Sequence, residues 1–142
     1  MVYVFQALSK ESENFFMEVQ IDAEETFLTL HETIQEALGF EDGQMTSFYL
    51  VDEDWTKEGE ITLVDMEMED NSGTGVMAEV KLKEKVSEIG NKLLYVFDLF
   101  NERALQLELA DIQDGDNQEG ALVTVLQGQK PQQIDDSFLD LT

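Results

Sequence analysis

The run TFLTLHETIQEALG, residues 26–39, has the clearest structural pattern in the chain. Its apolar residues recur at steps of three and four, the spacing that places side chains on one face of an α-helix. That face is formed by Phe27, Leu30, Ile34 and Leu38. The sequence therefore predicts a helix over residues 26–38 with one side in the protein core.

Both ends of this predicted helix carry signals. Asp22 followed by Glu25 resembles a capping box, and Thr26 could cap the helix instead. Gly39 suits the left-handed conformation that ends many helices. A shorter second helix is predicted where Leu82, Val86 and Ile89 precede Gly90.

Strand patterns lie on either side of the helix. Segments rich in β-branched and aromatic residues, several with apolar residues at every second position, cover residues 2–7, 15–21, 45–51, 61–64, 92–100, 105–109 and 121–126. The first two are predicted to form a hairpin and the last three a second meander. Residues 92–100 are apolar on both faces, which favours a central strand. The predicted fold class is α+β, with an antiparallel sheet of about five or six strands.

Length and composition are those of one folded domain. The chain has 142 residues, of which 42% are hydrophobic, and it has no cysteine. A core of ordinary size is expected for this length. We predict a single domain over residues 1–128 and an acidic tail over residues 129–142 that we expect to be mobile.

The charge is strongly one-sided. There are 32 acidic and 8 basic residues, for a net charge of −24. Nucleic acid and anionic membranes attract clustered lysine and arginine, so we expect neither direct nucleic-acid binding nor membrane binding. No apolar run is long enough to span a bilayer, and the cytoplasm is the expected location. The acidity is explained by solubility, by adaptation to high salt, or by an acidic surface for a basic partner.

The sequence contains no complete catalytic or metal-binding motif. His31 is the only histidine, and a lone histidine is weak evidence for a nucleophilic triad or a metal site. A calcium loop starting at Asp114 would have Glu119 at its sixth position, where glycine is needed. A loop starting at Asp52 fails in the same way. No catalytic, cofactor-binding or metal-binding residue is assigned, and cation binding by the acidic loops 52–70 and 111–120 stays open.

The tail offers a different kind of candidate. Ile134, Phe138 and Leu141 lie four and three residues apart among aspartates. On a helix they would form an apolar stripe with acidic flanks, which is typical of segments that dock into a partner's groove. A disordered end, or a segment packed on its own domain, gives the same sequence pattern.

Part of the chain resembles a known family. Residues 26–40, Phe48 and the run GNKLLYVFD at residues 90–98 resemble the plasmid pRiA4b open-reading-frame-three-like family, with a likeness that extends over residues 2–112. The resemblance implies an α+β fold and no established activity. Where that family commonly has a His-x-His pair, this chain has Gln44 and Thr46. Its Gly-Asp-Asp-Trp segment is also replaced here, so the resemblance leaves only the polar positions His31 and Asp98.

These observations favour a non-enzymatic accessory or protein-interaction domain without a cofactor. The expected partner is a basic or apolar protein, and the oligomeric state is not indicated. One alternative is a hydrolase or metal-dependent enzyme with a site near His31 and Asp98. A second alternative is an acidic mimic of nucleic acid, for which the segment 52–70 would supply clustered charge.

Overall fold

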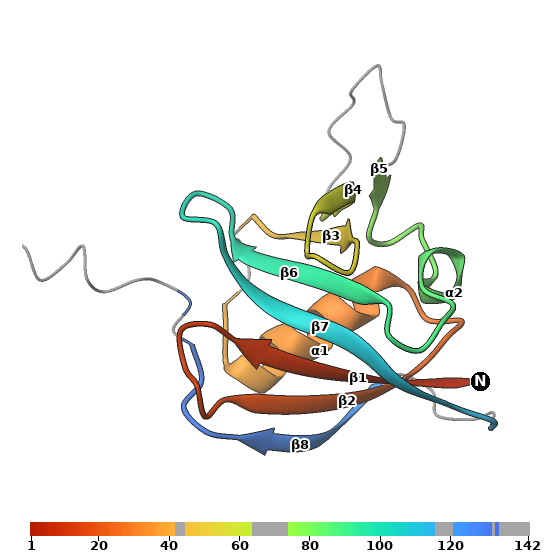
Figure 1. Ribbon diagram of the computed structural model, residues 1–142, viewed down its shortest axis with the longest axis horizontal. Coiled ribbons are helices and arrows are strands. Elements are labelled where there is room, and N and C mark those ends of the chain that lie inside the picture. Colours follow the sequence, from red (N-terminus) through yellow and green to blue (C-terminus); the bar gives the residue numbers. More distant parts are fainter. Residues whose placement is uncertain (42–44, 64–73, 116–120, 132, 134–142) are drawn as a thin grey trace, which may run out of the picture.

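The computed structural model describes residues 1–41, 45–63, 74–115, 121–131 and 133. These residues form one sheet of 8 strands with two helices (Figure 1). In chain order the elements are β1 (Val2–Ser9), β2 (Phe16–Asp22), α1 (Phe27–Leu38), β3 (Ser47–Val51), β4 (Lys57–Thr62), β5 (Thr74–Val76), α2 (Leu82–Lys85), β6 (Lys92–Asp98), β7 (Arg103–Gln113) and β8 (Ala121–Gln127). The predicted α+β class is thus confirmed.

The sheet is larger than predicted, and it is mixed. Its strand order is β5-β4-β3-β6-β7-β1-β2-β8, and every neighbouring pair is antiparallel except β4 with β5. The prediction of about five or six antiparallel strands was therefore too low. β5 has only three residues, TGV, so it is too short to show any alternation in the sequence.

The predicted second meander is wrong in one respect. β6 and β7 pair as expected, but β8 pairs with β2, and both β1 and β2 lie between β7 and β8. Consecutive strands are neighbours by default because short connections favour it. Here β1 pairs along β7 from Val2 to Ser9 and so occupies the edge that β8 would need.

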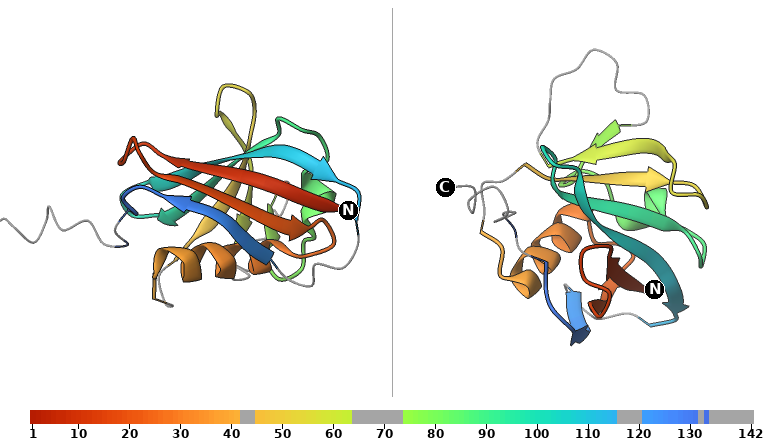
Figure 2. Two further views of the ribbon diagram at one scale, coloured as in Figure 1. Left: turned by 90° about the horizontal axis from the view of Figure 1, so that it is seen from below. Right: turned by 60° about the vertical axis from the view of Figure 1, so that its left-hand side comes forward.

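Helix α1 covers one face of the sheet (Figure 2). Thr26 is its N-cap, and the Thr26 hydroxyl accepts a hydrogen bond from the Thr29 backbone N–H at 3.3 Å. Gly39 ends the helix at φ 71°, in the left-handed region. The predicted apolar face is confirmed, because Phe27, Leu30 and Ile34 are fully buried. This face meets the sheet through aromatic contacts, and the Phe27 and Phe48 rings lie 5.2 Å apart.

Helix α2 is a single turn, shorter than its pattern suggested. Val86 is buried but has extended backbone at the C-cap, and Ile89 is 60% exposed. The apolar spacing therefore reflects a turn followed by a loop. No helix within the described parts of the chain has the length and apolar character needed to cross a membrane.

The first residues of the predicted tail lie against the domain. Pro131 is buried. The Glu41 backbone N–H donates to Gln133 Oε1 at 2.8 Å, and Gln133 Nε2 donates to the Glu41 carbonyl at 2.7 Å. The docking candidates Ile134, Phe138 and Leu141 lie outside the described residues.

Candidate functional site

His31 lies inside the protein, in a cluster of polar side chains between α1 and the sheet. Its Nδ1 is 2.7 Å from the Tyr95 hydroxyl and 3.3 Å from the Thr46 hydroxyl. Gln35, one turn further along α1, donates to the Tyr95 hydroxyl at 2.6 Å. Burial raises the pKa of Tyr95, although hydrogen bonds from Gln35 and Thr46 oppose the rise. This cluster satisfies buried polar groups and fastens α1 to β6.

Asp98 lies at the end of β6 and holds the turn that leads into β7. It accepts hydrogen bonds from the Asn101 backbone N–H at 3.2 Å and from Asn101 Nδ2 at 2.9 Å. Arg103 NH1 lies 3.5 Å from Asp98 Oδ2. Burial alone would raise the pKa of Asp98, but the hydrogen bonds from Asn101 and Arg103 outweigh it and lower the pKa. The carboxylate is therefore held ionised.

Arg103 connects Asp98 to two distant parts of the chain. Its guanidinium makes two hydrogen bonds to the Glu11 carboxylate, both at 2.8 Å, and a third to the Gln133 carbonyl at 3.2 Å. It also lies 4.9 Å from the centre of the Phe97 ring. These contacts fix the β1–β2 loop and the C-terminal segment against the β6–β7 turn.

His31 and Asp98 thus belong to two separate clusters. The hydrogen bonds given above for the two residues share no side chain. Among the residues that the structure describes, no group of three or more histidine, cysteine, aspartate or glutamate side chains is arranged to hold a metal ion. In place of a joint site, the structure shows two hydrogen-bonded clusters that support the fold.

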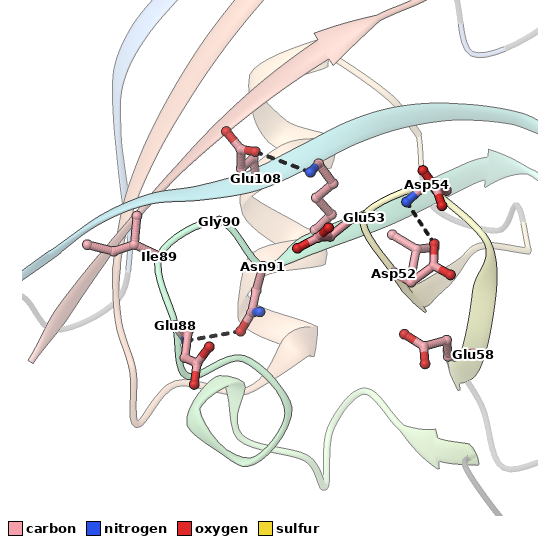
Figure 3. Close-up of a pocket in the computed structure, with 11 residues that line it drawn as sticks. Asp52, Glu53, Asp54, Glu58, Glu88, Ile89, Gly90, Asn91 and Glu108 are labelled. Atoms are coloured by element: carbon pink, nitrogen blue, oxygen red, sulfur yellow. Dashed lines mark hydrogen bonds and ion pairs between the residues drawn. The ribbon is translucent and has the colours of Figure 1, made fainter.

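An acidic pocket lies elsewhere on the part of the chain that the structure describes. It has a volume of about 690 Å³ and lies where the β3–β4 turn faces the loop before β6 (Figure 3). Six carboxylates line it: Asp52, Glu53, Asp54, Glu58, Glu88 and Glu108. The remaining lining residues are Val51, Ile89, Gly90, Asn91 and Lys92.

The acidic turn on one side of the pocket is fixed by Asp52. Its Oδ1 accepts hydrogen bonds from the backbone N–H groups of Asp54 at 2.8 Å and Thr56 at 2.9 Å. Trp55 completes the turn in the left-handed region, at φ 66°. Asp52 therefore uses its carboxylate to shape the turn, which presents Glu53 and Asp54 to the pocket.

The opposite wall is fixed by Asn91. Its Oδ1 accepts hydrogen bonds from the backbone N–H groups of Ser87 at 3.1 Å and Glu88 at 3.0 Å. The Asn91 carbonyl accepts from the Leu109 N–H at 2.8 Å, and the Gly90 N–H donates to the Leu109 carbonyl at 2.8 Å. The loop that carries Glu88 is thus hydrogen-bonded to β7, so both walls of the pocket are preorganised.

One cation belongs to this pocket. The Lys92 ammonium lies 3.7 Å from Glu108 Oε1 and 5.6 Å from the centre of the Trp55 ring. The Glu108 distance is too long for a strong hydrogen bond, and the ring distance is near the limit of a cation–π contact. One lysine against six carboxylates leaves the pocket strongly negative.

Sequence reasoning missed this pocket. The acidic segment 52–70 indicated negative charge, and residues 64–70 of it lie outside the described residues. Glu88 and Glu108 come from other parts of the chain, and nothing separates them in the sequence from the remaining acidic residues. Only the pairing of β6 with β3 and β7 brings the three segments together.

Comparison with known proteins identifies the family. A model of the "Plasmid pRiA4b ORF-3-like protein" family matches residues 3–137, nearly the whole chain. The chain belongs to the plasmid pRiA4b ORF-3-like family. The resemblance noted in the sequence is thereby confirmed, and it extends beyond residue 112. A comparison with curated proteins found no match.

A solved structure supports the fold of this pRiA4b ORF-3-like protein. This chain is similar to a crystal structure of a protein of unknown function from Methanosarcina mazei Go1, with a TM-score of 0.67 and 20% sequence identity. The match covers 88% of this chain and 68% of the other. At this identity the likeness shows a shared fold alone.

Proposed function

We propose that this protein is a non-enzymatic interaction domain that binds a basic segment of a partner protein in the acidic pocket. The observation that carries the proposal is that six acidic residues and one lysine line a space of about 690 Å³. This volume is in the range of ordinary ligand sites, whereas the lining is far more polar than that of an apolar-ligand pocket. A lysine or arginine side chain is the complementary ligand.

Two further features support a peptide ligand. A second, smaller cavity of about 290 Å³ shares Val51, Glu58, Asn91 and Lys92 with the pocket. The shared residues make the two cavities neighbours, and the second cavity, lined by Lys85 and Lys92 against Glu58, suits a non-basic side chain next to the lysine or arginine of an extended peptide. The net charge of −24 would also speed the approach of a cationic partner and repel anionic ones.

The proposal is tested by titrating the protein with a pentalysine peptide and following calorimetry and Trp55 fluorescence. Trp55 is the single tryptophan and lies beside Lys92, so its emission reports on the pocket. We expect binding that weakens as salt increases. The double variant Glu58→Gln/Glu88→Gln should bind more weakly by about fivefold, or about 1 kcal/mol.

A matched control separates the pocket from the overall charge. Glu13→Gln/Glu79→Gln removes the same number of charges from exposed positions that do not line the pocket. This control should bind pentalysine nearly as well as the unmodified protein does. Equal weakening by both double variants would show that charge acts without a site, and a lack of any binding would contradict the proposal outright.

A further inference from the structure

Strand β8 ends the sheet, and its outer side faces no other described strand. It lies at the lower border of the sheet in Figure 1, where it pairs with β2 and also contacts α1. The outer side of an edge strand presents unpaired backbone N–H and C=O groups, which form a ready template for another strand. The opposite edge of the sheet is β5, which has three residues against seven in β8.

The sequence of β8 lacks two of the features that usually protect an edge, charge and proline, and its one irregularity is the register shift against β2. It reads ALVTVLQ, with no charged residue and no proline, in a chain of net charge −24. Leu122 is 51% exposed and Leu126 is 38% exposed. The longer edge of this acidic protein is thus an uncharged strand with two exposed leucines.

The residue order of β8 indicates what could pair with it. Residues 122–126 read LVTVL, which is the same sequence in both directions. In an antiparallel pair of identical strands related by a two-fold axis at Thr124, Leu122 lies opposite Leu126 of the second copy. Val123 likewise lies opposite Val125 of the second copy. The palindrome therefore pairs leucine with leucine and valine with valine across the two-fold axis, and such apolar cross-strand pairs stabilise neighbouring strands.

The register shift in β8 occurs at Thr124, the central residue of this palindrome. The register shift between β8 and β2 lies between Glu18 and Val19, and it leaves Thr124 as the extra residue. The Thr124 hydroxyl donates to Glu18 Oε2 at 2.9 Å, so its side chain is held by β2. The irregular residue would lie on the two-fold axis, and the repeated Leu-Val pairs would lie on either side of it.

We propose that β8 is a homodimer interface, in which two copies pair their β8 strands in antiparallel fashion about Thr124 and join the two sheets. Charge favours this location for a second copy. Two chains of −24 repel one another, and β8 lets them approach along a strand that has no carboxylate. Because salt screens the remaining repulsion, dimerisation should strengthen as salt rises. This is opposite to the salt response expected for the acidic pocket.

The test is sedimentation velocity over a range of protein concentrations, at about 0.05 M and about 0.5 M NaCl. We expect a monomer–dimer equilibrium that shifts toward the dimer at higher salt. Leu122→Lys should weaken the dimer by tenfold or more, about 1.4 kcal/mol, because it places an ammonium group opposite Leu126 of the second copy. Leu8→Lys is the matched control, since Leu8 is also 51% exposed but lies on the interior strand β1.

The outcomes are distinct. A concentration-dependent dimer that Leu122→Lys weakens and Leu8→Lys leaves intact supports the β8 interface. A protein that stays monomeric at every concentration and both salt levels overturns it, as does equal weakening by the two lysine variants. Circular dichroism of each variant confirms that it is folded. Pentalysine binding by the monomer is measured separately, so either proposal can fail alone.

Discussion

Asp98 and Arg103 form a charge pair inside a protein whose charge is otherwise carried at the surface. Asp98 is the one carboxylate side chain of the described residues that is buried. Its partner Arg103 has 10% of its side chain exposed and also contacts Glu11 and the Gln133 carbonyl. Buried ions are retained only where partners satisfy them. We therefore interpret Asp98 as a structural residue that sets the β6–β7 turn and, through Arg103, the position of the C-terminal segment.

Removing the Asp98 charge should destabilise the fold. Asp98→Asn retains the shape of the side chain but leaves the Arg103 guanidinium with a weaker acceptor. We expect the free energy of unfolding in urea at neutral pH to fall by about 1–3 kcal/mol. The control is Glu102→Gln, which removes an exposed charge from the same turn and should change stability little. Equal stability of Asp98→Asn and the unmodified protein would contradict this role.

The same variant should change the response to acid. The pKa of Asp98 is lowered in the folded protein, so its stabilising effect is complete above the ordinary aspartate pKa of about 3.9 and is lost as pH falls through the lower folded value. The stability difference between the unmodified protein and Asp98→Asn should therefore shrink as pH falls below about 4. Urea unfolding at a series of pH values measures this difference, and a constant gap would contradict the assignment.

At the scale of the elements, two glycines end secondary structures for different reasons. Gly39 has φ 71° and open space around the position of a Cβ, so only its backbone conformation requires glycine. Gly128 follows β8 at φ 81°, and a Cβ there would lie 1.9 Å from the Asn14 carbonyl oxygen. The end of β8 is thus packed directly against the backbone of the β1–β2 loop.

These two glycines should respond differently to alanine. We expect Gly39→Ala to lower the free energy of unfolding by about 1 kcal/mol, the usual cost of a left-handed alanine. Gly128→Ala adds a clash with backbone that cannot move freely, so it should lower stability by more than about 2 kcal/mol. Gly115→Ala, in open space without a positive φ, is the control. Equal losses at Gly39 and Gly128 in urea unfolding would show that the close contact has no effect.

At the scale of the whole molecule, self-repulsion opposes folding. The net charge of −24 is spread over a surface of 8404 Å², and a compact acidic molecule brings these charges closer than the unfolded chain does. Its stability must therefore come from the core between α1 and the sheet, a cluster of 23 buried hydrophobic residues among the described positions.

Salt should consequently stabilise this protein. Raising NaCl from about 0.01 M to about 0.1 M shortens the screening distance from about 30 Å to about 10 Å and weakens repulsion between carboxylates. We expect the melting temperature to rise over this range, measured by circular dichroism at low protein concentration. The variant Glu58→Gln/Glu88→Gln should show a smaller rise, since it removes two of the repelling charges from the pocket. A melting temperature that falls with salt would contradict this account.

The sequence by itself determined features that depend on neighbouring residues. The 3.6-residue period of residues 26–38 predicted α1 and its buried face, period-two alternation predicted β2, and β-rich composition predicted β1. The family resemblance was also visible in residues 26–40 and 90–98, and the family model confirmed it. These signals are local because a helix or strand repeats its geometry every few residues.

Only the tertiary structure decided which distant residues meet. The position of β8 beside β2, the hydrogen bonds of His31 with Tyr95, and the convergence of Glu88 and Glu108 with the β3–β4 turn all depend on strand order. Strand order is set by competition among many pairings that bury similar apolar surface, and no short stretch of sequence records its outcome. In a chain with 32 acidic residues, the acidic pocket becomes recognisable only after the sheet has formed.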